Sequence, residues 1–378
     1  MTSDLWFMGF TLFTWGLGEG MFFFFNPLYL QQLGANPVMI GGVLGGVGIA
    51  MAVAHTPAGY LADRFGRRRL LWIGWGGALV SGWLMALASS LTVFVMGMIA
   101  YGLTAFVMSP LNSYVTGARG KLTPARAMTL VSAMYNTGAI IGPLAGGWIG
   151  NTYGLKTTYF AASCLFTISM LIILFIKRQP LEHHDPDAPP VNLLKNRRYI
   201  QFMGIVMLVM FATYLPQPLT QNFLQNERGL ALQQIGQLGS INSFGLVVFN
   251  LVLGQFDARA GFYFGQVSVA LFTFFLWRGT GMEWYMPAYF LVSGYRVIRP
   301  LIAAQVRDLI HGSQMGLAYG ITETISTIPA IIAPPIAGLL YAQDPLSIFP
   351  ISLVLIVVVL FVSILFTPKH LTEESHAS

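Results

Sequence analysis

A few ionisable side chains interrupt long uncharged stretches of this sequence. Glu19 and Glu323 are carboxylic acids that can exchange a proton, and a carboxyl group removed from water does so closer to neutral pH than an exposed one. Arg296 and Arg299 are three residues apart, hence on one side of a helix, and guanidinium groups suit a carboxylate or phosphate. We therefore expect Glu19 and Glu323 to couple to protons, and Glu19, Arg296 and Arg299 to contact a substrate.

Each of these residues also has a purely structural interpretation. Neighbouring hydroxyl groups or an arginine can stabilise Glu19 as a carboxylate inside the protein. Arg296 and Arg299 can form ion pairs with Glu323 or Glu19. The sequence leaves both interpretations open.

Further polar side chains are candidates for contacts in a mostly apolar binding pocket. Asn26 follows Glu19 by seven residues and is expected on the same helical face. The remaining candidates fall in two other uncharged stretches. They are Tyr101, Met108 and Asn112 in one stretch, and Tyr214, Gln217 and Gln221 in the other.

The low charge of the chain indicates a membrane protein. Of 378 residues, 55% are hydrophobic and 9% are charged, whereas soluble domains carry about 25% charged residues. Residues 20–62 and 70–118 contain no Asp, Glu, Lys or Arg, so each has room for two spans of about 20 residues. The apolar content excludes disorder, and the single cysteine excludes a disulfide scaffold.

The uncharged runs and the Gly and Pro residues between them predict twelve transmembrane helices. Their expected ranges are 5–33, 37–62, 69–88, 91–117, 126–152, 157–177, 198–225, 232–256, 262–278, 284–306, 314–342 and 345–367. The runs are continuous rather than alternating, which favours helices over a β-barrel. We expect an all-α polytopic protein with six-helix domains at 1–177 and 198–378, joined by a polar, proline-rich linker at 178–197.

Basic residues are distributed unequally between the two sets of expected loops. Fifteen Lys and Arg residues fall on one side, and only Lys156, Arg228 and Arg278 fall on the other. The larger group comprises the basic residues at 64–69, 119–126, 177–198, 259, 307 and 369. The positive-inside rule then predicts a cell (inner) membrane protein with both termini and the linker in the cytoplasm. These loops account for the net charge of +6, so nucleic-acid binding is not expected.

Short motifs recur in the second half of the chain at offsets of 191 to 195 residues. The matched pairs are Pro27-Leu28 with Pro218-Leu219, Ile40-Gly41 with Ile235-Gly236, Gly59 with Gly254, and Pro143 with Pro335. Their common order and offset indicate two duplicated halves. Such repeats, with a binding site between them, are typical of secondary transporters.

Residues 59–68 read Gly-Tyr-Leu-Ala-Asp-Arg-Phe-Gly-Arg-Arg, between the second and third expected helices. This segment resembles the G-x3-D-R-x-G-R-R loop of the major facilitator superfamily. The resemblance implies a conformational latch in which a carboxylate meets arginines and a helix N-terminus, and arginines meet lipid phosphate. The residues that carry it are Gly59, Asp63, Arg64, Gly66, Arg67 and Arg68.

Residues 138–147 resemble a second motif of that superfamily, g-x3-G-P-x2-G-G in the fifth helix, which is found especially in antiporters. Gly138, Gly142, Gly146 and Gly147 provide a smooth helical face for close contact, and Pro143 allows a bend. This motif favours export over import.

One position departs from the family pattern. Members often have an arginine in the fourth helix, four residues before a glycine, but Met98 precedes Gly102 here. The proton-exchange role of that arginine therefore does not carry over to this chain. Glu19 and Glu323 remain the candidate proton sites.

The resemblance implies a two-bundle fold that works by alternating access. We expect a monomeric secondary active transporter in membrane lipid that moves a small organic solute, by proton-coupled efflux, without a cofactor or metal. No nucleotide-binding or hydrolase motif is present in the sequence, so an enzyme is not expected. Proton-coupled uptake of an organic anion and translocation of a lipid or lysolipid stay open as alternatives.

Overall fold

The computed structural model describes residues 2–55, 66–178, 196–253, 257–309 and 315–367. Within these ranges every regular element is a helix. Gly59, Asp63 and Arg64 of the loop motif and residues 179–195 of the expected linker lie outside the described residues.

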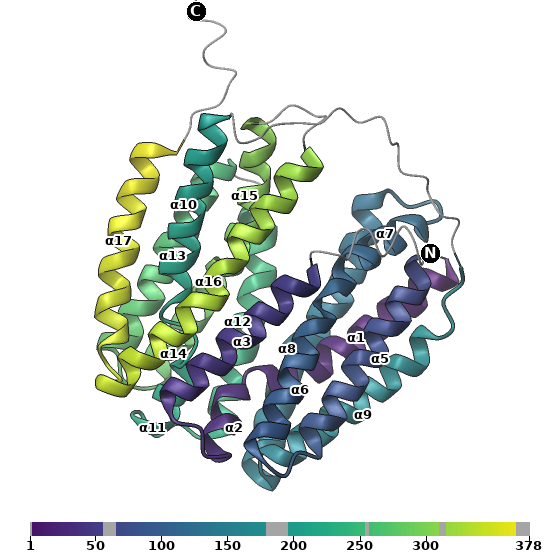
Figure 1. The fold of residues 1–378 in the computed structure, drawn as a ribbon, viewed down its shortest axis with the longest axis horizontal. Coiled ribbons are helices and arrows are strands. Elements are labelled where there is room, and N and C mark those ends of the chain that lie inside the picture. Colours follow the sequence, from purple (N-terminus) through teal and green to yellow (C-terminus); the bar gives the residue numbers. More distant parts are fainter. Residues whose placement is uncertain (1, 56–65, 179–195, 254–256, 310–314, 368–378) are drawn as a thin grey trace, which may run out of the picture. The chain divides into compact units, whose positions relative to one another are not determined.

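The helices follow the expected order along the chain (Figure 1). The first half contains α1 (Ser3–Phe23), α2 (Asn26–Gln32), α3 (Pro37–His55), α5 (Arg67–Ala86), α6 (Leu91–Leu103), the 3-10 helix η1 (Thr104–Val107), α7 (Met108–Gly117), α8 (Pro124–Tyr153) and α9 (Leu155–Ile173). The second half contains α10 (Arg197–Tyr214), α11 (Thr220–Asn226), α12 (Leu232–Leu253), α13 (Ala258–Arg278), α14 (Met282–Leu291), α15 (Gly294–Leu309), α16 (Met315–Gln343) and α17 (Ile348–Phe366). The predicted all-α architecture of twelve spans is confirmed.

Four expected spans are divided rather than continuous: 5–33, 91–117, 198–225 and 284–306. Proline explains two of these breaks, because it has no backbone N–H to continue a helix. Pro27 lies in the first turn of α2, and Pro216 and Pro218 follow the end of α10. The span 91–117 passes through η1, and the span 284–306 is divided into α14 and α15.

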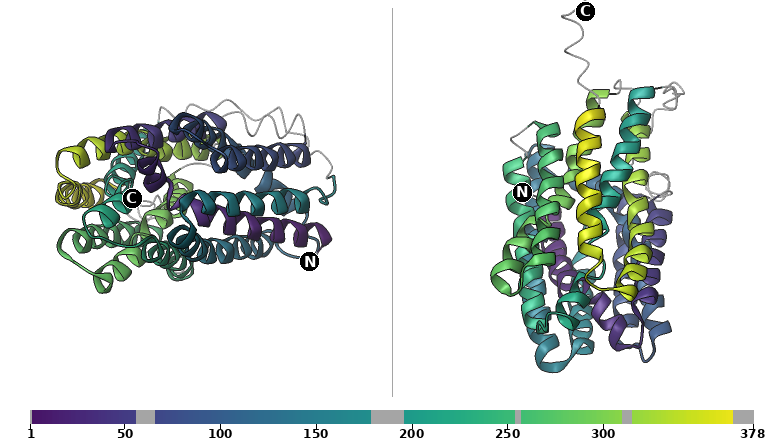
Figure 2. Two further views of the ribbon diagram at one scale, coloured as in Figure 1. Left: turned by 90° about the horizontal axis from the view of Figure 1, so that it is seen from below. Right: turned by 90° about the vertical axis from the view of Figure 1, so that its left-hand side faces the viewer.

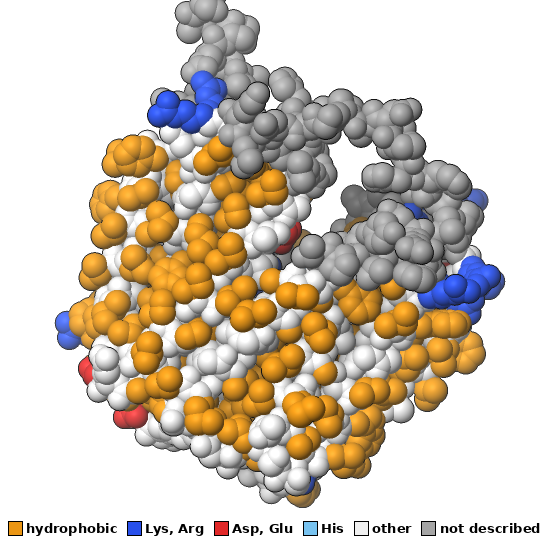
Figure 3. Space-filling view, in the orientation of Figure 1, with side chains coloured by type: hydrophobic (Ala, Val, Ile, Leu, Met, Phe, Trp, Pro, Cys, Tyr) orange, Lys and Arg blue, Asp and Glu red, His pale blue; other side chains and the backbone are white. Residues whose placement is uncertain are grey.

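The surface of the described helices is suited to lipid. Six of them are long and apolar enough to cross a membrane alone, and seven spans qualify if the bent pair α6–α7 counts as one. On the face drawn in Figure 3, hydrophobic side chains cover the sides of the helices, whereas Lys and Arg lie near helix ends. Apolar sides and basic ends are typical of helices that span a bilayer.

Contacts divide the chain into two compact units. Unit 1 comprises Met1–His184 and Gln221–Ser243, so it includes α11 from its second residue and the first half of α12. Unit 2 comprises Asp185–Thr220 and Phe244–Ser378. In unit 1, α1 packs against α8 and α9, and α5 against α6 and α9. In unit 2, α17 packs against α10 and α13, beside which it appears in yellow in Figure 2. A domain division at the linker stays a prediction.

The glycines of the 138–147 motif allow α8 to touch two helices at backbone distance. A Cβ on Gly142 would lie 2.8 Å from Gly20 Cα in α1, and a Cβ on Gly147 would lie 2.8 Å from the Leu232 carbonyl oxygen of α12. Real Cβ atoms essentially never approach other atoms closer than 3.0 Å. Any larger residue therefore forces α8 away from these neighbours.

A buried polar cluster fixes α1 on its other side. The Trp75 indole N–H, from α5, donates to Thr11 Oγ1 and Ser169 Oγ at 2.9 Å each. The Thr11 hydroxyl also donates to the Ser169 carbonyl oxygen of α9 at 2.7 Å. All three residues are buried, so these bonds satisfy polar groups that have no access to water.

We predict that Gly142→Ala lowers the thermal unfolding midpoint of the detergent-purified protein. The added methyl group overlaps the backbone of α1, and overpacking of this kind costs about 1–3 kcal/mol of unfolding free energy. Gly76→Ala on α5 is the matched control, because a Cβ there meets nothing within 4 Å. Equal midpoints for the two variants would contradict the close contact.

Candidate functional site

Glu19 lies half-buried on α1, where two tyrosines from other helices reach its carboxylate. The Tyr135 hydroxyl, from α8, donates a hydrogen bond to Glu19 Oε2 at 2.8 Å. Tyr101 of α6 also interacts with the Glu19 side chain. Phenol donors of this kind stabilise the ionised carboxylate through charge-assisted hydrogen bonds.

Tyr135 reaches Glu19 because the glycine motif holds α8 against α1. Gly138 follows Tyr135 by one helical turn, and a Cβ there would lie 2.6 Å from the Leu17 backbone nitrogen. Gly16 is equally close to the Tyr135 backbone on the facing side. The same contact that packs the helices therefore also sets the position of the hydrogen-bond donor.

Aromatic rings form the surroundings of Tyr101 beside Glu19. The centroid of the Tyr101 ring lies 5.4 Å from that of Phe22, 5.9 Å from that of Phe166 and 6.3 Å from that of Trp15. These rings come from α1 and α9. The side chains around the Glu19 carboxylate and its two phenols are therefore mostly apolar.

Asn26 does not lie on the same helix as Glu19, although the sequence predicted that the two share one helical face. The chain breaks at Phe24–Phe25, and Asn26 begins α2 with 7% of its surface exposed. Its Oδ1 accepts a hydrogen bond from the Tyr159 hydroxyl at 2.8 Å. Asn26 and Glu19 therefore do not share one continuous helical face, and substrate contact by Asn26 stays a prediction.

The arginine cluster lies in unit 2. Arg299 Nη1 of α15 lies 3.9 Å from Glu323 Oε2 of α16, and Arg299 Nη2 donates to the Ser326 carbonyl oxygen at 3.2 Å. The two charged side chains are 36% and 63% exposed. Arg299 and Glu323 thus form the ion pair that the structural interpretation expects. An ion pair this long and exposed contributes little to the free energy of unfolding.

Two tyrosines accompany these arginines. The Tyr214 and Tyr295 rings stack with centroids 5.2 Å apart and planes inclined by 22°. Both rings interact electrostatically with Arg296 and Arg299. Arg296 is exposed and Arg299 is half-buried, so the two guanidinium groups differ in their surroundings although they share α15.

The other candidates of the seventh expected span are separated by its break. The Gln217 amide donates to the Thr213 carbonyl oxygen at 2.7 Å, just beyond the end of α10. Gln221 belongs to α11 and to unit 1. Tyr214, Gln217 and Gln221 therefore do not lie on one continuous helix, and substrate contact by them stays a prediction.

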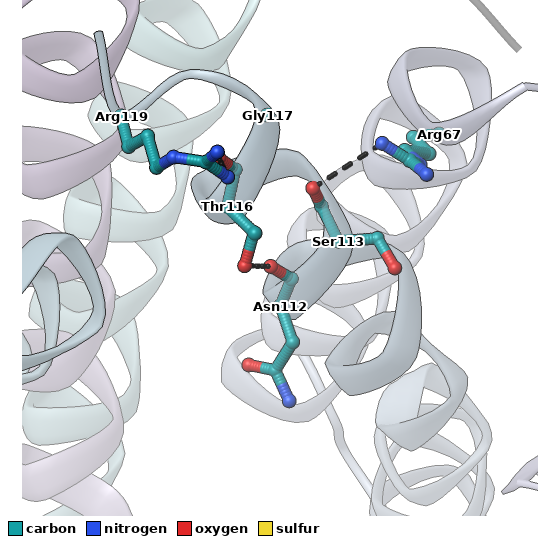
Figure 4. Close-up of a pocket in the computed structure, with 6 residues that line it drawn as sticks. All are labelled: Arg67, Asn112, Ser113, Thr116, Gly117 and Arg119. Carbon is teal, nitrogen blue, oxygen red and sulfur yellow. Dashed lines mark hydrogen bonds between the residues drawn. The ribbon is translucent and has the colours of Figure 1, made fainter. Parts of the chain in front are cut away.

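Asn112 lines a cavity of about 270 Å³ at the end of α7 rather than the Glu19 cluster (Figure 4). Its other lining residues are Arg67, Ser113, Thr116, Gly117 and Arg119. Arg67 Nη1 donates to the Ser113 carbonyl oxygen at 3.4 Å, and Arg119 Nη1 to that of Thr116 at 3.1 Å. Cations at C-terminal carbonyls stabilise a helix through its dipole.

The described residues of the loop motif make structural contacts beside this cavity. Arg67 contacts α7, and the Arg68 guanidinium lies 4.0 Å from the centroid of the Trp72 ring. Gly66 has a φ of 83° as it leads into α5, a conformation that glycine adopts readily. A latching role for these residues stays a prediction, as does substrate contact by Met108, which is 54% exposed.

Tyr135, which hydrogen-bonds to Glu19, and Tyr295, which stacks on Tyr214, were not among the residues expected from the sequence. Tyr135 lies one turn before the glycine motif, and that spacing was the available signal. Tyr295 adjoins Arg296 in sequence, but nothing there reveals its stacking on Tyr214. Within the described ranges no three His, Cys, Asp or Glu side chains are grouped to hold a metal ion.

The sequence matches the family described as Major Facilitator Superfamily over residues 8–220 and 202–378, which together span nearly the whole chain. The chain belongs to the Major Facilitator Superfamily. It is therefore a multi-pass membrane transporter of small molecules and not an enzyme. The resemblance noted from the two sequence motifs is confirmed.

Similar members of the superfamily include two bacterial resistance proteins. Multidrug resistance protein 2 of Bacillus subtilis (strain 168) is 24% identical over 345 residues, covering 86% of this chain and 85% of that protein. Quinolone resistance protein NorA of Staphylococcus aureus (strain MRSA252) is 24% identical over 357 residues, covering 90% of each. The crystal structure of the nucleoside transporter NupG has a TM-score of 0.82 at 14% identity, covers 97% of this chain and 100% of that chain, and shows the shared fold.

We predict that Glu323→Gln changes the unfolding free energy by no more than about 1 kcal/mol, because the pair with Arg299 is long and exposed. Thermal unfolding in detergent measures the effect, with Glu283→Gln at the exposed start of α14 as the control. A loss of about 3–5 kcal/mol, as for a broken buried pair, would show instead that the pair is structural.

Proposed function

We propose that the protein exports a small organic solute in exchange for protons, and that Glu19 carries the proton. The observation on which this proposal rests is the hydrogen bond from Tyr135 to a half-buried carboxylate on α1. An ionisable group within a membrane span is costly and for that reason often functional. The names of the two relatives, which refer to multidrug and quinolone resistance, support the direction of export.

Antiport follows if a proton and the substrate use Glu19 in alternation. The ionised carboxylate accepts a charge-assisted hydrogen bond from Tyr135, and this bond weakens when a proton neutralises Glu19. The two protonation states therefore differ in how strongly they tie α1 to α8. A ligand that binds one state better shifts the conformational equilibrium, and the coupling acts equally in both directions.

The glycine contacts provide a route for this coupling. Gly142 packs against Gly20, which is the next residue after Glu19, while Gly147 packs against Gly236 of α12. With no side chains between the backbones, a shift of α1 displaces α8 directly. In this proposal the protein lies in the cell (inner) membrane with both termini in the cytoplasm, so protons enter as the solute leaves.

A second candidate, proton-coupled uptake of an organic anion, is favoured by the cluster in unit 2. Arg296 is exposed, and Arg299 forms a 3.9 Å ion pair with Glu323 and donates to a backbone carbonyl. Protonation of Glu323 would remove that ion pair and free Arg299 for a carboxylate. Here substrate and proton move in the same direction.

Purified protein in liposomes distinguishes the two candidates. A quinolone is loaded, an inward proton gradient is imposed, and internal pH is followed with a trapped dye. Antiport predicts quinolone efflux together with internal acidification. No solute-dependent proton movement, or movement of both species in one direction, would contradict antiport.

We predict that Glu19→Gln reduces gradient-driven efflux at least about tenfold, because the amide cannot bind and release a proton. Tyr135→Phe keeps the ring but removes the hydrogen bond, and we expect a smaller loss. Glu283→Gln is the control and should transport normally. Gradient-driven efflux by Glu19→Gln at the rate of the unmodified protein would exclude Glu19 as the proton carrier.

We predict, for the second candidate, that Arg296→Gln lowers uptake of a carboxylate probe about tenfold while leaving an uncharged probe unaffected. The loss of one guanidinium–carboxylate interaction accounts for that factor. Arg307→Gln at the end of the same helix is the control. Equal uptake of the carboxylate probe by both variants would remove the anion site.

A further inference from the structure

A compact network of side-chain amides joins α2 to α11 within unit 1. Asn222 Nδ2 donates to Gln31 Oε1 at 2.5 Å and to the Pro27 carbonyl oxygen at 3.2 Å. Asn226 and Gln31 exchange two hydrogen bonds: Asn226 Nδ2 to Gln31 Oε1 at 3.1 Å, and Gln31 Nε2 to Asn226 Oδ1 at 3.2 Å. Gln31 thus joins both asparagines.

The network links equivalent positions of the two sequence repeats. Pro27 is matched by Pro218 at an offset of 191 residues, and Gln31 and Asn222 are separated by the same 191 residues. A hydrogen bond between residues at the same position of the two repeats forms only where the two repeats meet. Such a contact is made or broken when the repeats rearrange.

The chemistry of the network suits a contact that opens and closes. Amides are neutral, so separating them leaves no unpaired charge, and each hydrogen bond has a modest net contribution because water replaces the partner. Gln31 is half-buried and Asn226 is exposed, so water can reach them. Asn222 is 1% exposed, and its Oδ1 has no hydrogen-bond partner among the described residues, so it is not fully satisfied in this state.

We propose that Gln31, Asn222 and Asn226 form an uncharged latch, which holds the α2 and α11 ends together in the state described here and breaks when the transporter opens at that end. The loops beside the latch, 33–36 and 227–231, lie on the side with few basic residues, which is predicted to face away from the cytoplasm. The proposal depends on alternating access and not on Glu19 or on the direction of transport.

The distance between the α2 and α11 ends tests the latch. Gln32→Cys and Glu227→Cys, both at exposed positions, are spin-labelled in the full chain carrying Cys164→Ser, and electron–electron distances are recorded in lipid nanodiscs without substrate or a proton gradient. We expect Gln31→Ala to raise the ratio of long to short distances about fivefold, the effect of losing roughly one net hydrogen bond. Gln225→Ala, an amide of α11 outside the latch, is the matched control.

The second measurement tests whether Gln31 and Asn222 act as one network. If one network holds the ends together, Gln31→Ala with Asn222→Ala should shift the distances little more than Gln31→Ala alone. An unchanged distance distribution in Gln31→Ala, or one that matches Gln225→Ala, would overturn the latch. Because no transport is measured, the latch can fail while proton exchange by Glu19 holds, and the reverse is also true.

Discussion

The backbone contact between α1 and α8 is the constraint on which the candidate site depends. Gly20 and Gly142 meet with no side chain between them, and this closeness allows the Tyr135 hydroxyl to lie 2.8 Å from Glu19. In a membrane, helices gain little from hydrophobic association, so close van der Waals packing and hydrogen bonds determine how they pair. The glycine motif therefore serves packing and site geometry through one contact.

Polar groups within the described helices are satisfied mainly by neutral partners. Glu19 accepts from a phenol, and the Trp75 indole donates to two hydroxyls. The pair of Arg299 and Glu323 is charged, but it is long and exposed. Neutral hydrogen bonds tie helices together without requiring charges to be buried in pairs. The amides of α2 and α11 follow the same principle.

Much of the fold follows from the sequence, whereas the composition of the site follows only in part. Uncharged runs located the helices, and the motifs around Gly66 and Gly142 identified the superfamily. The positions of Asn26 and Gln221 could not be inferred, because proline breaks their spans and so changes which face each residue occupies. Tyr135 was missed because its partner, Glu19, is 116 residues away in the chain.

The sequence by itself determined that this chain crosses a membrane repeatedly, as two related halves of the Major Facilitator Superfamily, and that its few intramembrane charges are exceptional. Those features are local: hydropathy, motif spacing and an offset between repeats. Only the tertiary structure decided which groups meet, such as Tyr135 with Glu19 and Gln31 with Asn222. These contacts depend on how closely helix backbones approach and on where helices break, and both are properties of packing between distant segments.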